Sequence, residues 1–214
     1  MKDKRIGFYD YTVILTYMGM LLACAGIIKA VDGAYWDSCV CLMLSGLCDT
    51  FDGAVASTKK MRNAREKHFG IQIDSLSDLI SFGVLPAVFV YCITGFNKTA
   101  GLIGSLFTLC ALIRLAYYNV LELERQSKPE KEDKIYLGIP VTVVALFLPL
   151  VFMIYEKGLF GNDYCFMILL GIMGAGFLAP VTIKNPSIKG KAVLVVLGIT
   201  ELIVLLLKAK AGAV

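Results

Sequence analysis

The hydrophobic positions of this chain are gathered into long blocks, separated by shorter polar connections. Each block is close to the 17–25 residues that a helix needs to cross the hydrocarbon core of a bilayer. Short connections between successive helices imply antiparallel neighbours. The pattern predicts an all-α, polytopic transmembrane helical bundle with six core spans and a further one at its end. The predicted spans are roughly residues 11–31, 34–57, 72–96, 99–122, 138–157, 163–182 and 191–208.

The composition agrees with a membrane protein. Of the 214 residues, 57% are hydrophobic and 18% are charged, and the mean hydropathy is +0.73. A soluble domain averages about 45–50% apolar and about 25% charged residues. No low-complexity segment or domain boundary divides the chain, so residues 1–214 are expected to form a single integral-membrane domain. The seven cysteines lie in or beside the apolar blocks without metal-ligand spacing, and we interpret them as small buried residues.

The positive charges favour one orientation in the membrane, because Lys and Arg accumulate in cytoplasmic connections. The N-terminus and the connections at 58–71 and 123–137 are therefore expected in the cytoplasm of a multi-pass cell-membrane protein. The net charge of +4 follows from this topology and from attraction to anionic membrane lipids, so no nucleic-acid partner is implied. The larger, cytoplasmic set is Lys2, Lys4, Arg5, Lys59, Lys60, Arg62, Arg65, Lys67, Arg125, Lys128, Lys131, Lys134, Lys184, Lys189 and Lys191. The smaller set is Lys29, Lys98, Lys157, Lys208 and Lys210.

Four aspartates lie where two apolar blocks border the 58–71 connection. Asp49 and Asp52 are separated by one helical turn, and so are Asp74 and Asp78, so each pair occupies one face of its helix. Because both helices flank the same connection, the four carboxylates are expected to converge in one pocket at the cytoplasmic boundary. The small residues Gly53 and Ala56 would allow close approach of a ligand, or tight helix packing.

This concentration of acid needs a compensating charge. An Asp inside a transmembrane helix costs about 2.5–3.5 kcal/mol on insertion scales, and such residues usually mark function. Four together also repel one another. A divalent cation would offset both the cost of insertion and the repulsion between the carboxylates. Mg²⁺ and Mn²⁺ prefer oxygen ligands, and Mg²⁺ is commonly held by carboxylates and substrate phosphates. The pattern therefore indicates a Mg²⁺ or Mn²⁺ site, with solvated helix caps as the alternative.

The residues around these aspartates resemble the signature of the CDP-alcohol phosphotransferases. That signature is D-x-x-D-G-x-x-A-R, followed after about eight residues by G-x-x-x-D-x-x-x-D, and DTFDGAVA (49–56) and GIQIDSLSD (70–78) match it. DSLSDLISFGVLPA (74–87), IRLAYYNV (113–120) and GIPVT (138–142) are similar to the CDP-diacylglycerol–serine O-phosphatidyltransferases, the phosphatidylserine synthases. The resemblance covers roughly residues 8–190. Ser57 replaces the signature's Arg, and the stretch before Gly70 is four residues longer.

The resemblance implies that the phosphatidyl group of CDP-diacylglycerol passes to the hydroxyl of L-serine, giving phosphatidylserine and CMP. It implies a divalent metal held by Asp49, Asp52 and Asp74, with Asp78 as a further ligand and as the general base. It also implies a homodimer, and the charge distribution given above predicts that this active site faces the cytoplasm. Basic residues near Ser57 would replace the missing Arg, which would help to hold the diphosphate. The expected CDP-diacylglycerol site comprises Thr16, Gly53, Ala56, Ser57, Lys59, Lys60 and Gly70.

Four further residues are candidates for binding serine or phosphate: Arg114, Asn119, Ser75 and Ser81. Each has a structural alternative. Arg114 could form an ion pair with an aspartate, Asn119 could join two helices by a hydrogen bond, and the serines could be small polar packing residues. Thr16 matches the approximate place of a polar motif in the family, but hydrogen bonding within its own helix explains it as well.

Two other functions fit parts of the pattern. The same chemistry could use glycerol 3-phosphate, inositol or inositol phosphate as the acceptor, although the SFGVLP, RLAYYN and GIPVT stretches favour serine. A carboxylate-lined transporter would also contain intramembrane acids. However, the chain shows no internal repeat, and its aspartates border a single cytoplasmic connection.

Overall fold

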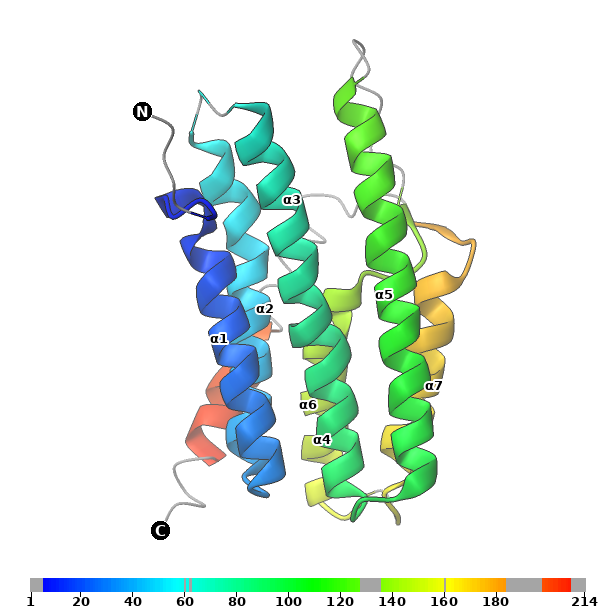
Figure 1. Cartoon of the computed structure of the whole chain (residues 1–214). Helices are drawn as coiled ribbons and strands as arrows, with labels where there is room; N and C mark the ends of the chain where they lie inside the picture. Colours follow the sequence, from blue (N-terminus) through cyan, green and yellow to red (C-terminus); the bar gives the residue numbers. More distant parts are fainter. Residues whose placement is uncertain are drawn as a thin grey trace.

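The computed structural model describes residues 6–59, 61, 63–127, 136–159, 161–183 and 198–208, and these form one helical bundle (Figure 1). Its helices are α1 (Tyr11–Val31), α2 (Tyr35–Ser57), α3 (Ala64–Asp78), α4 (Leu85–Ile93), α5 (Lys98–Ser127), α6 (Val144–Glu156) and α7 (Tyr164–Leu178). Residues 198–208 are also helical. Two short strands, β1 (Tyr136–Leu137) and β2 (Thr182–Ile183), pair antiparallel. The predicted all-α membrane bundle is confirmed.

Among the described residues, four helical segments are long and apolar enough to cross a membrane. They are Tyr11–Val31, Tyr35–Ser57, Ala64–Ile93 and Lys98–Arg125. The predicted fifth and sixth spans correspond to shorter apolar helices, Val141–Glu156 and Tyr164–Leu178. Only residues 198–208 of the predicted seventh span are described. The chain is therefore a multi-pass membrane protein whose fifth and sixth predicted spans are shorter than the sequence predicted.

The connection between α2 and α3 is also shorter than predicted, because α3 begins at Ala64 and not near residue 72. Asn63 caps this helix. Its side-chain oxygen accepts a hydrogen bond from the Glu66 backbone N–H at 2.8 Å, and its amide nitrogen donates to Glu66 Oε1 at 3.2 Å. This reciprocal arrangement resembles a capping box. Residues 65–68 are polar, so the predicted apolar block omits about two turns of helix at residues 64–71.

A wide helical turn separates the two parts of the third span. The π-helical segment η1 (Leu79–Val84) follows Asp78 directly, and α4 continues from its end. Pro86 lies in the first turn of α4 and has no N–H to donate to the preceding turn, which favours this wider winding. Phe82, within η1, is fully buried. The wide turn therefore lies between the last aspartate of α3 and the apolar core.

Helices α1 and α2 pack closely through small residues, as membrane helices often do. The Ser45 hydroxyl donates to the Gly19 carbonyl at 3.0 Å, and the Ser38 hydroxyl donates to the Gly26 carbonyl at 2.8 Å. A Cβ atom at Gly26 would lie 3.0 Å from the Cys41 Cβ, so the two backbones approach too closely for a side chain there. The buried small residues of α1 are Gly19, Ala23, Gly26 and Ala30.

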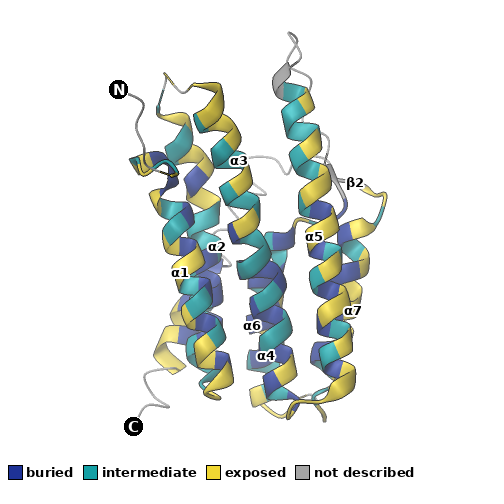
Figure 2. Ribbon diagram, in the orientation of Figure 1, coloured by how far each residue is buried: buried dark blue, intermediate teal, exposed yellow. Residues whose placement is uncertain are grey.

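The core of the bundle is aromatic and lies away from the aspartates. The Phe89 ring is 5.7 Å from the Phe152 ring and 6.1 Å from the Phe166 ring, and all three side chains are buried. The outer faces of the helices carry exposed residues, many of them large and apolar, such as Leu21 and Leu102 (Figure 2). Lipid tails are as apolar as leucine, so this outer surface suits a bilayer.

The GIPVT turn joins the start of α6 to the end of α7. The Gly138 N–H donates to the Val181 carbonyl at 2.8 Å, and the Ile139 N–H donates to the Gly176 carbonyl at 3.0 Å. Gly138 has a φ of 69°, and a Cβ there would lie 2.8 Å from the Gly176 and Phe177 oxygens. This turn therefore requires glycine.

Candidate active site

The structure brings the carboxylates of α2 and α3 together. Oxygens of Asp49, Asp74 and Asp78 all lie within 4.8 Å of one another. The Asp52 carboxyl is within hydrogen-bonding reach of Asp74, and the Asp49 carboxyl is within reach of Asp78. Asp52 is buried, and the other three are half-buried. Helical spacing, which places each pair on one face, thus produces a single cluster between α2 and α3.

Helix α1 contributes a hydroxyl group to this cluster. The Thr16 Oγ1 donates to Asp52 Oδ2 at 2.9 Å, across 36 positions of sequence. The Ser77 Oγ, on α3, donates to the Thr16 backbone carbonyl at 3.3 Å. Thr16 therefore connects all three helices and fixes one oxygen of Asp52. Of the two interpretations of Thr16 from the sequence, this contact favours the one that places it in the site.

A divalent cation fits this donor set. Carboxyl groups this close, in an apolar bundle, require either protons or a cation between them. An octahedral Mg²⁺ holds oxygens at about 2.0–2.1 Å, so ligands on opposite sides of the ion are about 4 Å apart. The oxygens of Asp49, Asp74 and Asp78, within 4.8 Å of one another, lie near this separation. Hard oxygen donors of this kind suit Mg²⁺ or Mn²⁺.

Two cavities adjoin the cluster. The inner one is about 10 Å³, enough for about one water-sized species, and its wall includes Asp49, Asp52 and Asp78. The outer cavity is about 180 Å³. Thr16 and Asp52 line both, so the two spaces are adjacent. The outer wall consists of Thr12, Val13, Thr16, Asp52, Gly53, Ala56, Lys67, Gly70, Ile71 and Asp74.

Most residues predicted to bind the nucleotide lipid line this outer cavity. Thr16, Gly53, Ala56 and Gly70 are all in its wall. A Cβ atom at Gly53 would meet no heavy atom within 4 Å, so the cavity is open at that backbone position. Ser57 is exposed and donates to the Ala54 carbonyl at 2.6 Å. The binding roles of these residues stay predictions, as does that of Lys60, which lies outside the described residues.

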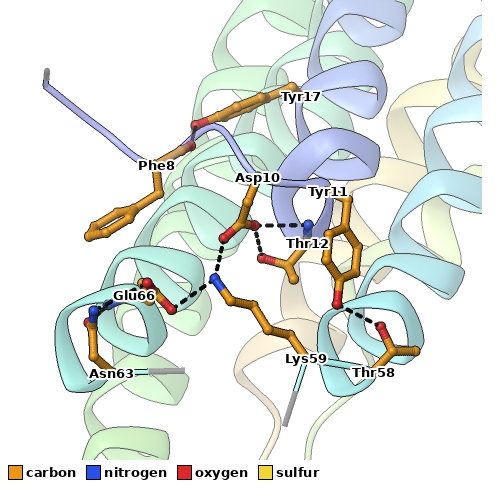
Figure 3. Close-up of polar contacts among 9 residues, drawn as sticks. All are labelled: Phe8, Asp10, Tyr11, Thr12, Tyr17, Thr58, Lys59, Asn63 and Glu66. Carbon is orange, nitrogen blue, oxygen red and sulfur yellow. Dashed lines mark hydrogen bonds and ion pairs between the residues drawn. The ribbon is translucent and has the colours of Figure 1, made fainter. Parts of the chain in front are cut away.

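Lys59 is engaged in two ion pairs near the start of α1 (Figure 3). Its Nζ lies 2.7 Å from Asp10 Oδ2 and 3.1 Å from Glu66 Oε2. The bond from Lys59 holds the pKa of Asp10 at about 2, well below its usual range, and both acids raise the pKa of Lys59. Asp10 also caps α1 by accepting from the Thr12 N–H at 3.0 Å. Lys59 thus links the end of α2 to the starts of α1 and α3.

The four candidates for serine or phosphate binding lie in three places. Ser75 and Asn119 lie between α3 and α5, Ser81 is in the wall of the inner cavity, and Arg114 lies near the GIPVT turn. The Ser75 Oγ donates to Asn119 Oδ1 at 2.6 Å, which joins α3 to α5 beside Asp74. Ser81 is buried, lines the inner cavity and shares a hydrogen bond with the Ser45 hydroxyl, the two oxygens being 2.9 Å apart. The two serines and Asn119 are close to the carboxylates, and their roles in binding stay predictions.

Arg114 is buried near the GIPVT turn. Its Nη1 donates to the Phe177 carbonyl at the end of α7, at 3.2 Å, and its guanidinium lies 4.6 Å from the centre of the Tyr118 ring. A cation is favourable both at a helix C-terminus and over an aromatic face. These contacts give Arg114 a structural role that the sequence interpretation did not name, and its predicted role in binding stays a prediction.

The sequence interpretation missed Lys67 as a residue of the cavity wall. Lys67 precedes Gly70 by three positions and Asp74 by seven, which places all three on one helical face. This signal depends on a helix that begins before residue 67. A loop at residues 58–71, as the sequence predicted, has no helical face and so does not place Lys67 beside Gly70 and Asp74.

Comparison with known proteins gives a consistent result. A family model described as CDP-alcohol phosphatidyltransferase matches residues 11–183. The archaetidylserine synthase of Methanothermobacter thermautotrophicus is 34% identical over 150 residues, which cover 68% of this chain and 59% of that protein. A CDP-diacylglycerol–serine O-phosphatidyltransferase of Helicobacter pylori is 29% identical over 173 residues, which cover 77% of this chain and 69% of that protein.

The enzyme of the same name from Saccharomyces cerevisiae is 40% identical over 125 residues, which cover 56% of this chain and 43% of the yeast protein. This chain therefore spans about half of the yeast relative and 59% of the archaeal one. The family match includes α2 and α3, since it begins at the first residue of α1 and ends at the last residue of β2.

Proposed function

Because this chain belongs to the CDP-alcohol phosphatidyltransferase family, we propose that it transfers the phosphatidyl group of CDP-diacylglycerol to the hydroxyl of L-serine. The products are phosphatidylserine and CMP. The observation that supports this most is the cavity that joins Gly53, Ala56 and Gly70 to the carboxylates of Asp52 and Asp74. The names of the archaeal, bacterial and yeast relatives all contain serine, which favours serine as the acceptor.

In this proposal the nucleotide lies in the outer cavity, where Gly53 and Ala56 leave its approach to the backbone open. The diphosphate lies toward the carboxylate cluster, and the acyl chains extend into the bilayer along the apolar outer surface. Asp49, Asp52, Asp74 and Asp78 would hold Mg²⁺ or Mn²⁺, which when bound neutralises the charge of a diphosphate. Phosphoryl transfer depends mainly on positioning and on such charge stabilisation.

Asp78 acts as the general base. Its carboxylate takes the proton of the serine hydroxyl while that oxygen attacks the phosphorus attached to diacylglycerol. The bond from this phosphorus to the bridging oxygen of the diphosphate breaks, and CMP leaves with that oxygen and the electron pair. A base must lie within hydrogen-bonding reach of the proton it removes. In this proposal only the serine hydroxyl enters the inner cavity and reaches Asp78, because that cavity has room for about one water-sized group. Ser77 and Ser81 are in the same wall.

The active site faces the cytoplasm of the cell membrane in this proposal. Lys59, Arg65 and Lys67 lie at the same end of the bundle as the outer cavity, and such basic residues accumulate on the cytoplasmic side. A homodimer stays a prediction from the family resemblance.

An acceptor comparison tests the proposed function. The purified protein in detergent is incubated with CDP-diacylglycerol and Mn²⁺ or Mg²⁺, and CMP release is measured with L-serine, glycerol 3-phosphate, inositol or no acceptor. We expect release with L-serine only, accompanied by formation of phosphatidylserine. Release with glycerol 3-phosphate or inositol and none with serine would assign a different acceptor. The sample without acceptor controls for hydrolysis.

A further inference from the structure

The wall of the outer cavity has an uneven distribution of charge. Two carboxylates, Asp52 and Asp74, lie in it, and Lys67 is its one cationic side chain among the described residues. A substrate with a diphosphate carries negative charge on both of its phosphate groups. A metal ion held by the aspartates would meet this charge at the inner end of the cavity, and Lys67 lies in position to meet it from α3.

The Lys67 side chain is available for an anionic ligand. It is exposed, and within the described part of the chain it makes no hydrogen bond or ion pair. Lys59, at the same end of the bundle, differs in this respect. Its ammonium group is held between Asp10 and Glu66, as Figure 3 shows. A ligand that recruited Lys59 would have to replace two ion pairs, whereas Lys67 would lose none.

The face of α3 that carries Lys67 borders the cavity along its length. Lys67, Gly70, Ile71 and Asp74 follow the i, i+3, i+4, i+7 pattern of one helical face, and all four are in the wall. At a rise of about 1.5 Å per residue, the Cα atoms of Lys67 and Asp74 are about 10 Å apart along the helix axis. The flexible lysine stem allows its ammonium to approach a phosphate group located between these two positions.

Helix α2 supplies no cation on the opposite side of the cavity at its last residue. Ser57 follows Ala56, which is in the wall, and its hydroxyl donates to the Ala54 carbonyl. The family signature has Arg at this position. We propose that Lys67 binds the diphosphate of the nucleotide lipid and supplies, from α3, the positive charge that α2 lacks at residue 57. This inference rests on the proposed function.

Direct binding tests this role without turnover. The affinity for CDP-diacylglycerol is measured by calorimetry in detergent with Mn²⁺ and without any acceptor. We expect Lys67→Gln to raise the Kd about 10-fold or more, as is typical when a hydrogen bond to a charged group is lost. Lys67→Arg keeps the charge and should bind within about threefold of the unmodified chain. Since Lys67 is exposed, the melting temperature of Lys67→Gln should be unchanged, which the same samples can verify.

Arg65→Gln is the matched control. It removes one positive charge from the same helix, but Arg65 is exposed and is not in the cavity wall. We expect its Kd to equal that of the unmodified chain. An equal loss of affinity in Arg65→Gln and Lys67→Gln would overturn the specific role of Lys67, because the effect would then be one of surface charge.

A second variant tests whether a cation on α2 can replace the cation that α3 supplies. Ser57→Arg, introduced into Lys67→Gln, should recover most of the lost affinity, because it adds a cation directly after Ala56, which lines the same cavity. An unchanged Kd in Lys67→Gln, with serine-dependent CMP release intact in the unmodified chain, would overturn the role of Lys67 and leave the proposed function standing. Failure of the unmodified chain to bind CDP-diacylglycerol would overturn both.

Discussion

Asp78 is the residue on which the proposed chemistry depends most. It is the last residue of α3, directly before the wide turn η1, and it lines the inner cavity with Asp49 and Asp52. Asp74, in contrast, lines the outer cavity, where the nucleotide lipid would bind. The two carboxylates of α3 thus face different spaces, and this separation supports different roles for them.

We expect Asp78→Asn to lower the rate of serine-dependent CMP release by about 10²–10⁴-fold, because a positioned base contributes about that much. The asparagine has nearly the same shape, and the other three carboxylates remain, so the Kd for CDP-diacylglycerol should change only a few-fold. Rate and affinity are measured on the same preparation. Turnover equal to that of the unmodified chain would exclude Asp78 as the base.

Asp10 gives a prediction about pH. Its pKa in the folded protein is about 2, compared with an ordinary value of 3.8, because Lys59 donates a hydrogen bond to its carboxylate. The folded state therefore keeps Asp10 ionised at pH values where the unfolded chain takes up a proton. The stabilisation is fully present above about pH 4 and is lost as the pH falls through about 2.

Asp10→Asn should lower the melting temperature at pH 7, and the difference from the unmodified chain should shrink between pH 4 and pH 2. The Asp10 and Lys59 side chains are only half-buried and remain in contact with solvent, so the difference at pH 7 should be small, on the order of 2 °C. Thermal unfolding in detergent, followed by fluorescence at several pH values, measures it. A difference that is as large at pH 2 as at pH 7 would contradict the assigned ion pair.

At the scale of elements, the close contact of α1 and α2 holds Thr16 against Asp52. A substitution at this contact tests how much the contact contributes to the free energy of unfolding. Gly26→Ala should lower the free energy of unfolding by about 1–3 kcal/mol, because the added Cβ would lie 3.0 Å from Cys41 Cβ and from Leu85 Cδ2. Gly171→Ala is the control, since a Cβ there meets nothing within 4 Å. It should be neutral or slightly stabilising. Equal destabilisation by both would show that the loss does not come from the contact of Gly26 with α2.

The sequence predicted some elements better than others, for a physical reason. The apolar blocks located α1, α2 and the start of α5 to within about a residue, because burial in lipid requires apolar side chains throughout a span. The start of α3 was wrong because a helix outside the bilayer has no such requirement. There the local signal was the cap formed by Asn63 and Glu66, which a search for apolar blocks does not detect.

The site was predictable where it depends on helical spacing. The convergence of the aspartates follows from their positions on two adjacent helices. The pairing of Lys59 with Asp10 and the contact of Ser75 with Asn119 join residues 49 and 44 positions apart, and these depend on how distant helices approach one another. The same holds for Arg114, whose partner carbonyl at Phe177 is 63 positions away. No single stretch of sequence contains that information.

At the scale of the whole molecule, the orientation in the membrane can be tested by chemical labelling. Met61, between α2 and α3, is 89% exposed, and Asn162, before α7, is also exposed. A membrane-impermeant maleimide should label Met61→Cys only from the cytoplasmic side and Asn162→Cys only from the outer side. The seven native cysteines are buried or half-buried and should give a low background. Labelling of Met61→Cys from outside would invert the proposed topology.

The proposed metal site connects all three scales, since two residues from each of two helices must meet between α2 and α3. Its most direct test is a titration of the purified protein with Mn²⁺ under saturating CDP-diacylglycerol, in which free Mn²⁺ is measured by electron paramagnetic resonance. We predict saturable binding to the unmodified chain, and its loss when Asp49 and Asp74 are both replaced by asparagine in a protein that remains folded. Equal Mn²⁺ binding by the two proteins, or none by the unmodified chain, would contradict a cation held between α2 and α3.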